Sequence, residues 1–281
     1  MEITEKDLSL FFDTVKQVSA YDFTEYSEKS LKRRLERILT ERKLDFKNFV
    51  LKIKLDHTFL EEIVKDITVN TTELFRDPEI WQEIQFKVLN KLKNKDEINI
   101  WHAGCSTGQE VYSFAIMLNE LGLFEKSNIY ASDLNSDVLQ IARKGEYRYR
   151  FNLSYLSNFD KVLKENKYNY TEKKDVEYTK YFRIDTRKDK IIIHDFLRNK
   201  PIYSVKDLTK PNNFPANKFD IIFCRNVLIY FNLKLQNKVI DTFYTNLKES
   251  GFLILGKHES LLGYTEDKFD KRGKFYQKKQ F

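Results

Sequence analysis

The sequence predicts an α/β protein built on a doubly wound, mostly parallel sheet, with a small all-helical domain in front of it. Three observations lead to this prediction. Strand and helix signals alternate from residue 98 onward, helical periodicity fills residues 5–66, and the segment 146–200 interrupts the alternation with short β-like runs. Alternation at this spacing is typical of a parallel sheet with helices on both faces. At 281 residues the chain is long enough to bury a large core.

Residues 1–68 are predicted to form the helical domain. The apolar residues of one segment recur at i, i+4, i+7 and i+8, as on one face of a helix: Leu31, Leu35, Ile38 and Leu39. The other faces of that segment carry cations: Lys32, Arg33, Arg34 and Arg37. Residues 29–54 hold ten Lys or Arg against three acids, which equals the net charge of +7 of the whole chain. This basic segment is either a solvated surface or a site for an acidic or phosphorylated partner.

The sheet is predicted from strands and helices that follow one another in order. The strand signals are INIW at 98–101, NIYAS at 128–132, FDIIFC at 219–224 and FLILG at 252–256. The helix signals are GQEVYSFAIMLNEL at 108–121, closed by Gly122, then SDVLQIARKG at 136–145 and a segment around 235–247. Such sheets bind ligands at the carboxyl ends of their strands.

The segment 146–200 is rich in tyrosine and lysine and weak in helical period. Its β-like runs are VEYTKYFRI at 176–184 and KIIIHDF at 190–196. We predict a small antiparallel β elaboration here; a surface excursion without function is the alternative.

Composition argues against several other classes of protein. No window approaches the roughly 18 uninterrupted apolar residues of a membrane span, and the N-terminus is acidic where a signal peptide would be basic. We therefore expect a cytoplasmic protein without membrane insertion. Cys105 and Cys224 fall at the ends of buried strands and are interpreted as apolar filler. The histidines lack metal-ligand spacing, His102 near Cys105 included, so no metal is predicted.

The turn after the first strand, AGCSTGQE at 103–110, indicates a nucleotide-like ligand. Small residues between a strand and a helix let a ligand approach the backbone. The turn lacks the G-x-G-x-x-G pattern of a dinucleotide site and the Gly-Lys of a triphosphate site. S-adenosylmethionine carries no phosphate and fits best.

Two acids support a cofactor of this kind. Asp133 follows the second strand, where a doubly wound nucleotide site places a carboxylate on the ribose hydroxyls. Its alternative role is to cap the helix SDVLQIA. Glu110 stands three residues after Thr107, so the pair also forms a potential capping box.

Five motifs, in order along the chain, resemble those of the CheR family, the chemoreceptor glutamate O-methyltransferases. They are NTTELFRDP at 70–78, WHAGCSTGQEVYS at 101–113, ASDLNSDVLQIARKGEY at 131–147, FDIIFCRNVLIYF at 219–231 and GKHES at 256–260. The resemblance implies a Rossmann-like S-adenosylmethionine-dependent methyltransferase sheet, residues 91–281, behind a linker at 69–90 that carries cofactor contacts.

The resemblance also implies roles for individual residues. Arg76 and Tyr230 match the positions at the reacting centre. The cofactor contacts match Asn70, Thr72, Arg76, Gly104, Glu110, Asp133, Asp195, Phe196, Arg225 and Asn226. Arg33, Arg34 and Arg37 of the basic segment are expected to bind the substrate.

This chain departs from the family pattern at three places. It has Gln109, Glu110 and Val111 where the family usually has Glu-Glu-Pro, and Thr40 where an arginine is common. It also has Asp195-Phe196 where the family commonly has Asn-Leu beside the adenine. An aspartate still accepts a hydrogen bond from the adenine amino group.

The implied reaction moves a methyl group from S-adenosylmethionine to glutamate carboxylates, giving the methyl ester and S-adenosylhomocysteine. A glutamate with a pKa of about 4.3 is already ionised at neutral pH, so the reaction needs positioning and no general base. The implied partner is the cytoplasmic part of a chemoreceptor or related sensory protein, without nucleic acid, and the enzyme is expected to be a monomer. A nucleic-acid methyltransferase and a non-catalytic S-adenosylmethionine-binding signalling module are the alternatives.

Overall fold

The computed structural model describes residues 2–68, 70–150, 153–165, 175–211 and 214–280. The chain forms two compact units. The first comprises Met1–Val69 with Val227–Lys238, and the second comprises Asn70–Asn226 with Val239–Phe281.

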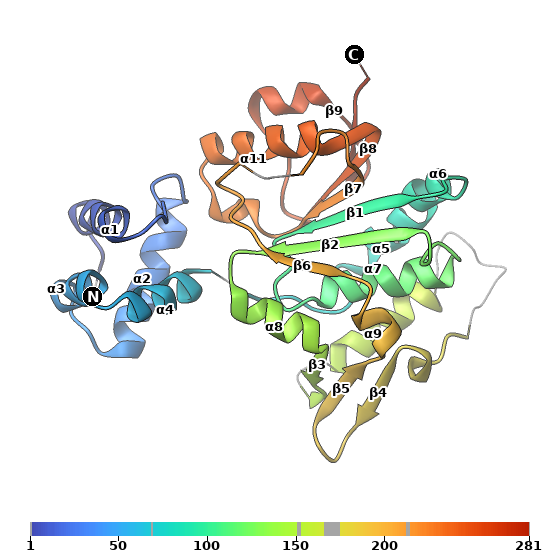
Figure 1. Ribbon diagram of the computed structural model, residues 1–281, viewed down its shortest axis with the longest axis horizontal. Helices are drawn as coiled ribbons and strands as arrows, with labels where there is room; N and C mark the ends of the chain where they lie inside the picture. Colours follow the sequence, from blue (N-terminus) through green and yellow to red (C-terminus); the bar gives the residue numbers. More distant parts are fainter. Residues whose placement is uncertain (1, 69, 151–152, 166–174, 212–213, 281) are drawn as a thin grey trace. The chain divides into compact units, whose positions relative to one another are not determined.

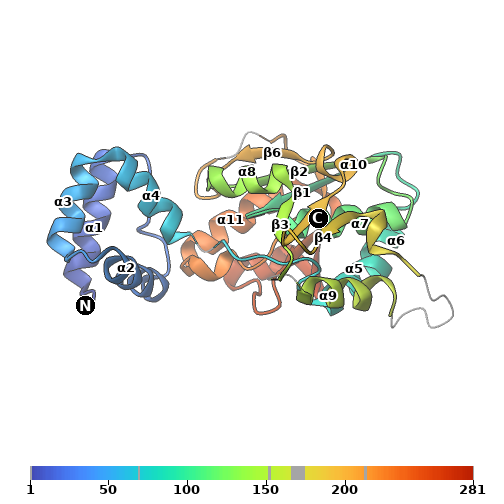
Figure 2. The same cartoon turned by 90° about the horizontal axis from the view of Figure 1, so that it is seen from below.

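The first unit is built from four helices, α1 (Glu5–Val18), α2 (Glu28–Arg42), α3 (Phe46–Leu55) and α4 (His57–Ile67). Figure 2 shows these helices packed against one another. Asp45 and Asp56 begin α3 and α4 by accepting hydrogen bonds from backbone N–H groups in the first turn. The predicted apolar face of α2 is buried, and Phe11 stacks on Phe49 in the core. The helical expectation for residues 5–66 is confirmed.

Residues 227–238 belong to this first unit although they follow a strand of the second. They contain a 3₁₀ turn, Leu228–Tyr230, and the start of helix α11 (Leu233–Asn246). The carbonyl of Tyr230 accepts a hydrogen bond of 2.8 Å from the backbone of Ser27. Phe231 forms a β-bridge with Tyr26, and their rings meet edge to face at 5.2 Å.

The second unit contains a seven-stranded sheet in the order β6-β2-β1-β7-β8-β10-β9. Its strands are β1 (Ile98–Ala103), β2 (Ser127–Asp133), β6 (Ile202–Val205), β7 (Phe219–Cys224), β8 (Leu247–Leu255), β9 (Phe269–Arg272) and β10 (Phe275–Lys278). The five strands from β6 to β8 are parallel, and β10 runs antiparallel to both of its neighbours, β8 and β9. The doubly wound sheet is confirmed, with an antiparallel C-terminal hairpin in addition.

Helices cover both faces of this sheet, as Figure 1 shows. Helices α5 (Pro78–Ile84) and α7 (Gln109–Glu120) lie against one face, where Trp81 and Phe114 contact Phe223 of β7. Helix α11 lies against the other face, where Phe243 packs edge to face on Trp101 of β1. A five-residue π-helical stretch, Gln85–Leu89, joins α5 to the short α6 (Asn90–Leu92). Helix α8 (Ser136–Lys144) contacts β2 and β6.

The predicted β elaboration is a three-stranded antiparallel sheet, β3 (Glu146–Arg148), β5 (Lys190–Ile193) and β4 (Phe182–Asp185). Both strand predictions were too long. Residues Tyr178–Lys180 form a 3₁₀ turn before β4, and Asp195–Arg198 form the helical turn α10 after β5. The segment also contains a helix, α9 (Leu153–Leu163), which the weak overall periodicity concealed. Its buried face is formed by Tyr155, Phe159, Val162 and Leu163.

No helix in the described residues is both long and apolar enough to span a membrane. Cys105 and Cys224 are both buried and free, in agreement with their interpretation as apolar filler.

Candidate active site

The carboxyl end of β1 runs into a tight loop of small residues before α7. The backbone N–H groups of Gly104 and Cys105 both donate to the carbonyl of Ser132, at 2.8 and 2.9 Å, which ties the loop to β2. Gly104 has φ 78° and Ser106 has φ 50°. Gly108, with φ 89°, packs so closely on α8 that an added Cβ would lie 2.8 Å from Cβ of Ala142. This glycine therefore serves helix packing, whereas Gly104 lies directly after the carboxyl end of β1.

Asp133 ends β2 beside that loop. Its carboxylate accepts hydrogen bonds from the backbone of Ser106 at 2.8 Å and of Asn135 at 3.0 Å. Burial raises the pKa of Asp133, and these backbone donors offset part of the rise. The alternative role of Asp133 as a helix cap is wrong, because Asn135 caps α8 through its own side chain.

Glu110 lies in the first turn of α7 and bridges two strands. One of its oxygens is 2.9 Å from Nδ1 of His102 on β1, and the other is 3.2 Å from Nη1 of Arg225 after β7. The predicted capping box is absent: α7 begins after Gly108 without a side-chain cap, and Thr107 donates to Gln109 instead. Burial raises the pKa of Glu110, but the hydrogen bond from His102 and the charge of Arg225 outweigh it and lower the pKa.

Arg225 is the buried centre of the edge, with its side chain only 2 % exposed. Besides Glu110 it binds the carboxylate of Asp77 at 2.7 Å and the carbonyl of Arg76 at 2.9 Å. Its guanidinium also lies over the ring of Trp81. These contacts hold the segment Arg76–Asp77 and α7 together.

Arg76 is half-buried, and its carbonyl rather than its guanidinium holds it in place. That carbonyl accepts from Trp81 Nε1 at 2.8 Å as well as from Arg225. The neighbouring acids are occupied elsewhere, since Asp77 binds Arg225 and Glu79 binds Lys257. In the described residues the guanidinium of Arg76 pairs with no carboxylate, and its recorded side-chain contact is a 3.5 Å bond to the carbonyl of Thr71.

Asn70 and Thr72 are half-buried in the segment that leads to Arg76. The hydroxyl of Tyr155 on α9 donates to the carbonyl of Thr72 at 3.1 Å, so the elaboration anchors this segment. Asn226 follows Arg225 with φ 60°, and its backbone N–H donates to Glu259 at 2.7 Å. Glu259 also accepts from the backbone of Gly256 at 2.8 Å and so ties the ends of β7 and β8 together.

Backbone strain gathers at the same edge. Eight non-glycine residues in the described chain have positive φ, and four of them are Phe75, Asp77, Ser106 and Asn226. Phe75 is fully buried, and positive φ is a marked outlier for so bulky a residue. Strain of this kind persists where the surroundings hold a functional geometry in place.

Asp195 and Phe196 are not brought to this edge, which corrects the prediction of an adenine contact there. They lie on α10 before β6 begins, and the ring of Phe196 contacts Phe124, which precedes β2. Asp195 and Phe196 therefore lie near the amino ends of β2 and β6, whereas Asp133 lies at the carboxyl end of β2. At the carboxyl end of β6, the backbone of Lys206 donates to the carbonyl of Asp133, and Asp207-Leu208 follow. The Asp-Leu pair is closer to the family's Asn-Leu, a signal that could have located the site.

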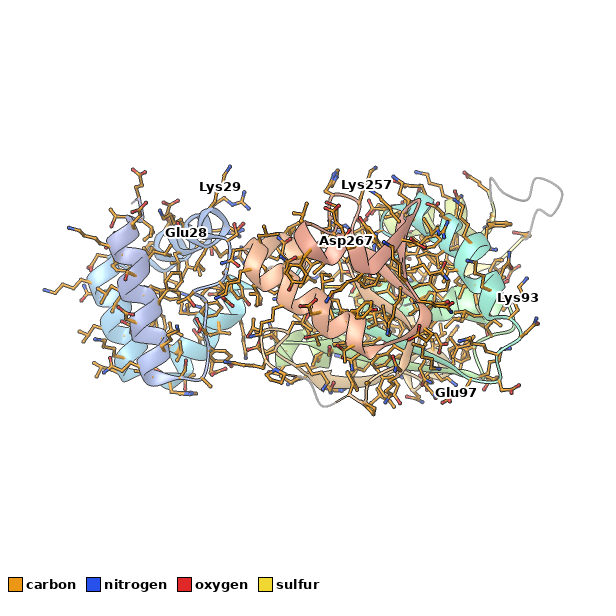
Figure 3. The ribbon with its side chains drawn as sticks, turned by 90° about the horizontal axis from the view of Figure 1, so that it is seen from above. Glu28, Lys29, Lys93, Glu97, Lys257 and Asp267 are labelled. Carbon is orange, nitrogen blue, oxygen red and sulfur yellow. The ribbon has the colours of Figure 1, made fainter. Side chains whose placement is uncertain are left out.

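The remaining predicted residues belong to the first unit, and each is described within it. Tyr230 lies in the 3₁₀ turn bound to Ser27. Arg33 and Arg37 are exposed on α2, and Arg37 pairs with Glu41 at 2.6 Å. Arg34 is half-buried and donates to the carbonyl of Asp66 at the end of α4, so its role is partly structural. Figure 3 shows Lys29 of the same helix extending from the ribbon.

Among the described residues no group of three or more potential metal ligands comes together. Three of the residues that organise the edge, Asp77, His102 and Glu259, were not predicted as site residues. Their contacts depend on strand register and on loop geometry, which sequence spacing does not reveal.

Comparison with known proteins agrees with this architecture. Residues 70–276 match the CheR methyltransferase, SAM binding domain, and residues 6–68 match the CheR methyltransferase, all-alpha domain. The fold and site thus define an S-adenosylmethionine-dependent methyltransferase. The chain belongs to the CheR methyltransferase family.

Relatives align with nearly the whole chain. A Pseudomonas putida protein named as methyltransferase Cher3 is 31 % identical, over 92 % of this chain and 90 % of its own. The chemotaxis protein methyltransferase of Borreliella burgdorferi is 31 % identical over 94 % of this chain and 91 % of its own. That of Listeria innocua is 30 % identical over 92 % and 91 %.

Proposed function

We propose that this enzyme methylates glutamate side chains on the cytoplasmic part of a chemoreceptor or a related sensory protein. The observation that carries this proposal is Arg76, a half-buried cation whose neighbouring acids are already paired with other residues. A guanidinium without a carboxylate partner is suited to bind one, through paired N–H donors. The relatives named as chemotaxis protein methyltransferases point to the same class of substrate.

The residues of the edge fit S-adenosylmethionine. Bound there, it would supply an electrophilic methyl group on a positively charged sulfur. Asp133 would accept hydrogen bonds from ribose hydroxyls, and Glu110 would hold the cationic amino group. Arg225, Glu110 and Asp77 together carry one net negative charge, which suits a cationic ligand. We further propose that Asp207 and Leu208, rather than Asp195 and Phe196, lie beside the adenine.

The protein substrate requires positioning rather than activation. A glutamate carboxylate is ionised at neutral pH, and transfer forms one O–CH₃ bond while one S–CH₃ bond breaks, so no proton moves. Alignment of reactants can contribute on the order of 7 to 11 kcal/mol. We assign the orientation of the carboxylate to Arg76, with Tyr230 as the second group at the reacting centre, and assign Asn70, Thr72, Gly104 and Asn226 to the cofactor.

Helix α2 is the proposed contact for the acidic substrate. Arg33 and Arg37 are exposed, with Arg37 in a solvent-exposed pair with Glu41, whereas Arg34 also holds α4. We propose that the enzyme acts as a cytoplasmic monomer. Nucleic acid is a poorer substrate because the run at the end of β7 reads Cys224-Arg225-Asn226-Val227, where enzymes that methylate the amino group of a flipped base typically have Asn/Asp-Pro-Pro-aromatic.

Transfer of labelled methyl groups from S-adenosylmethionine tests this proposal. The purified enzyme is incubated in parallel with a receptor cytoplasmic fragment, with RNA and with DNA. We expect label in the receptor fragment alone. Label in nucleic acid, or no transfer to any acceptor by an enzyme that binds the cofactor, would contradict it.

A further inference from the structure

His102 is a fully buried histidine in the middle of the cofactor domain. It lies on β1 directly opposite Phe223 of β7, and its ring stacks on the Phe223 ring at 4.5 Å with an interplanar angle of 7°. The Phe114 ring of α7 meets it at 5.8 Å. Two aromatic neighbours thus fix the plane of the imidazole, and its polar edge is left for one partner, Glu110.

The two oxygens of Glu110 are held by one residue on strand β1 and one residue directly after strand β7. Nδ1 of His102 is 2.9 Å from one oxygen, and Nη1 of Arg225 is 3.2 Å from the other. Two donors at the two ends of a carboxylate prevent its rotation. The Glu110 side chain remains 14 % exposed.

The other nitrogen of His102 identifies its protonation state. Nε2 is buried and has no hydrogen-bond partner among the described residues. A proton on Nε2 would be buried without an acceptor, so we assign the single proton to Nδ1, where it is donated to Glu110. The neutral ring orients Glu110 without adding charge. A cation in its place would cancel the net negative charge of Arg225, Glu110 and Asp77.

We propose that His102 is a positioning residue for the cofactor: a neutral Nδ1–H donor that fixes Glu110 in the orientation that binds the cationic amino group of S-adenosylmethionine. This inference rests on the proposed role of Glu110. It places one determinant of cofactor affinity on strand β1, outside the glycine-containing loop that follows the strand.

Two substitutions separate positioning from packing. His102→Phe keeps a ring on Phe223 but removes the donor, whereas His102→Asn places an amide N–H near the position of Nδ1. We expect calorimetric titration to show about three- to tenfold weaker S-adenosylmethionine binding for His102→Phe, the range for one lost hydrogen bond. Binding by His102→Asn should stay within about twofold of wild type.

The inference is overturned if His102→Phe binds the cofactor like wild type, or if His102→Asn binds as weakly as His102→Phe. Should His102→Phe not fold, nitrogen NMR of the wild-type protein decides instead. We expect a neutral ring protonated at Nδ1, and a ring protonated at Nε2 would contradict the inference. A wild-type protein that fails to bind S-adenosylmethionine would overturn the proposed function itself.

Discussion

The charged side chains at the carboxyl edge of the sheet and those on α2 contrast in burial and in partners. Arg225 at the edge is 2 % exposed and binds two carboxylates and a carbonyl. Arg37 on α2 is 63 % exposed and pairs with Glu41, itself 57 % exposed. Buried charges are screened little by salt, whereas exposed ones are screened strongly. We therefore expect the buried charges at the edge to fix the geometry of the cofactor site. We expect the exposed charges on α2 to attract an acidic substrate over a longer range, with a strength that depends on ionic strength.

Removal of Arg225 should give the largest effect. Arg225→Met leaves Glu110 and Asp77 without their common cation in a buried site, and breaking such a pair costs about 3 to 5 kcal/mol. Chemical denaturation should report that loss in the free energy of unfolding. The matched control is Arg37→Met, which breaks an exposed pair and should cost less than about 1 kcal/mol. Equal losses in the two variants would remove the distinction between the regions.

Asp133→Ala should give the next largest effect, on cofactor binding. The ribose hydroxyls would lose an ionised acceptor, and S-adenosylmethionine binding should weaken by about 1 to 3 kcal/mol. Asp137→Ala on the exposed side of α8 is the control and should bind normally. Calorimetric titration makes the measurement, and undiminished affinity in a folded Asp133→Ala would exclude the ribose contact.

The two edge carboxylates should also separate in their pH dependence. Burial raises the pKa of Asp133, while His102 and Arg225 outweigh burial and lower that of Glu110. As pH falls, Asp133 therefore protonates first and cofactor affinity declines while Glu110 is still ionised. Folding stability changes with opposite signs: protonation of Asp133 at its raised pKa stabilises the fold, whereas the contribution of Glu110 is lost progressively as pH falls from the ordinary glutamate pKa through its lowered folded-state pKa.

Titrations of cofactor affinity against pH check this order. The cofactor affinity of the wild-type enzyme should decline at a higher pH than the ordinary pKa of an aspartate would give. In Asp133→Asn this decline of affinity with falling pH should be absent. An unchanged acid profile in Asp133→Asn would assign the titration to another group.

Arg76→Ala should slow turnover about tenfold or more, equivalent to roughly 1.4 kcal/mol of activation free energy. The fold should remain intact, because the recorded contact of the guanidinium is one long bond to Thr71. Tyr230→Phe should likewise lower turnover without unfolding. Steady-state rates and thermal melts distinguish these outcomes, and wild-type rates in both variants would remove the two residues from the reacting centre.

The α2 substitutions should give the smallest effect and the one most sensitive to salt. Reversal of Arg33, Arg34 and Arg37 to Glu should raise KM for the protein substrate severalfold, with little change in cofactor affinity. The double reversal of Arg33 and Arg37 spares the Arg34 contact with α4 and serves as the control for folding. Wild-type activity should fall with ionic strength, and a salt-independent KM would make α2 a solvated surface only.

Sequence periodicity and loop composition predicted much of this fold, because amphipathic helices and buried parallel strands leave strong local signals. The helical domain, four of the five parallel strands and the placement of Glu110 and Asp133 at one edge follow from such signals, whereas strand β6 (Ile202–Val205) was not predicted. Helix α9 escaped prediction because its apolar stripe of Tyr155, Phe159 and Val162 lies within a tyrosine- and lysine-rich segment.

The misplaced pair shows the limit of motif spacing. Asp195 and Phe196 follow an apolar strand, as the adenine pair should, but that strand is β5 of the small sheet. Only topology shows that β6 lies beside β2, and that Asp207 therefore follows the same edge of the sheet as Asp133. The contact of His102 with Glu110 likewise depends on where β1 meets α7, eight residues later in the chain.

The central claim, methyl transfer to receptor glutamates, is tested most directly by mapping the modified residues. A receptor cytoplasmic fragment is incubated with the enzyme and S-adenosylmethionine, digested and sequenced by mass spectrometry, with an Arg76→Ala reaction in parallel. We predict methyl groups on glutamate side chains that mild base releases as methanol, and strongly reduced modification by Arg76→Ala. Base-stable methyl groups on other residues, or an unmodified receptor in the presence of a cofactor-binding enzyme, would contradict the account.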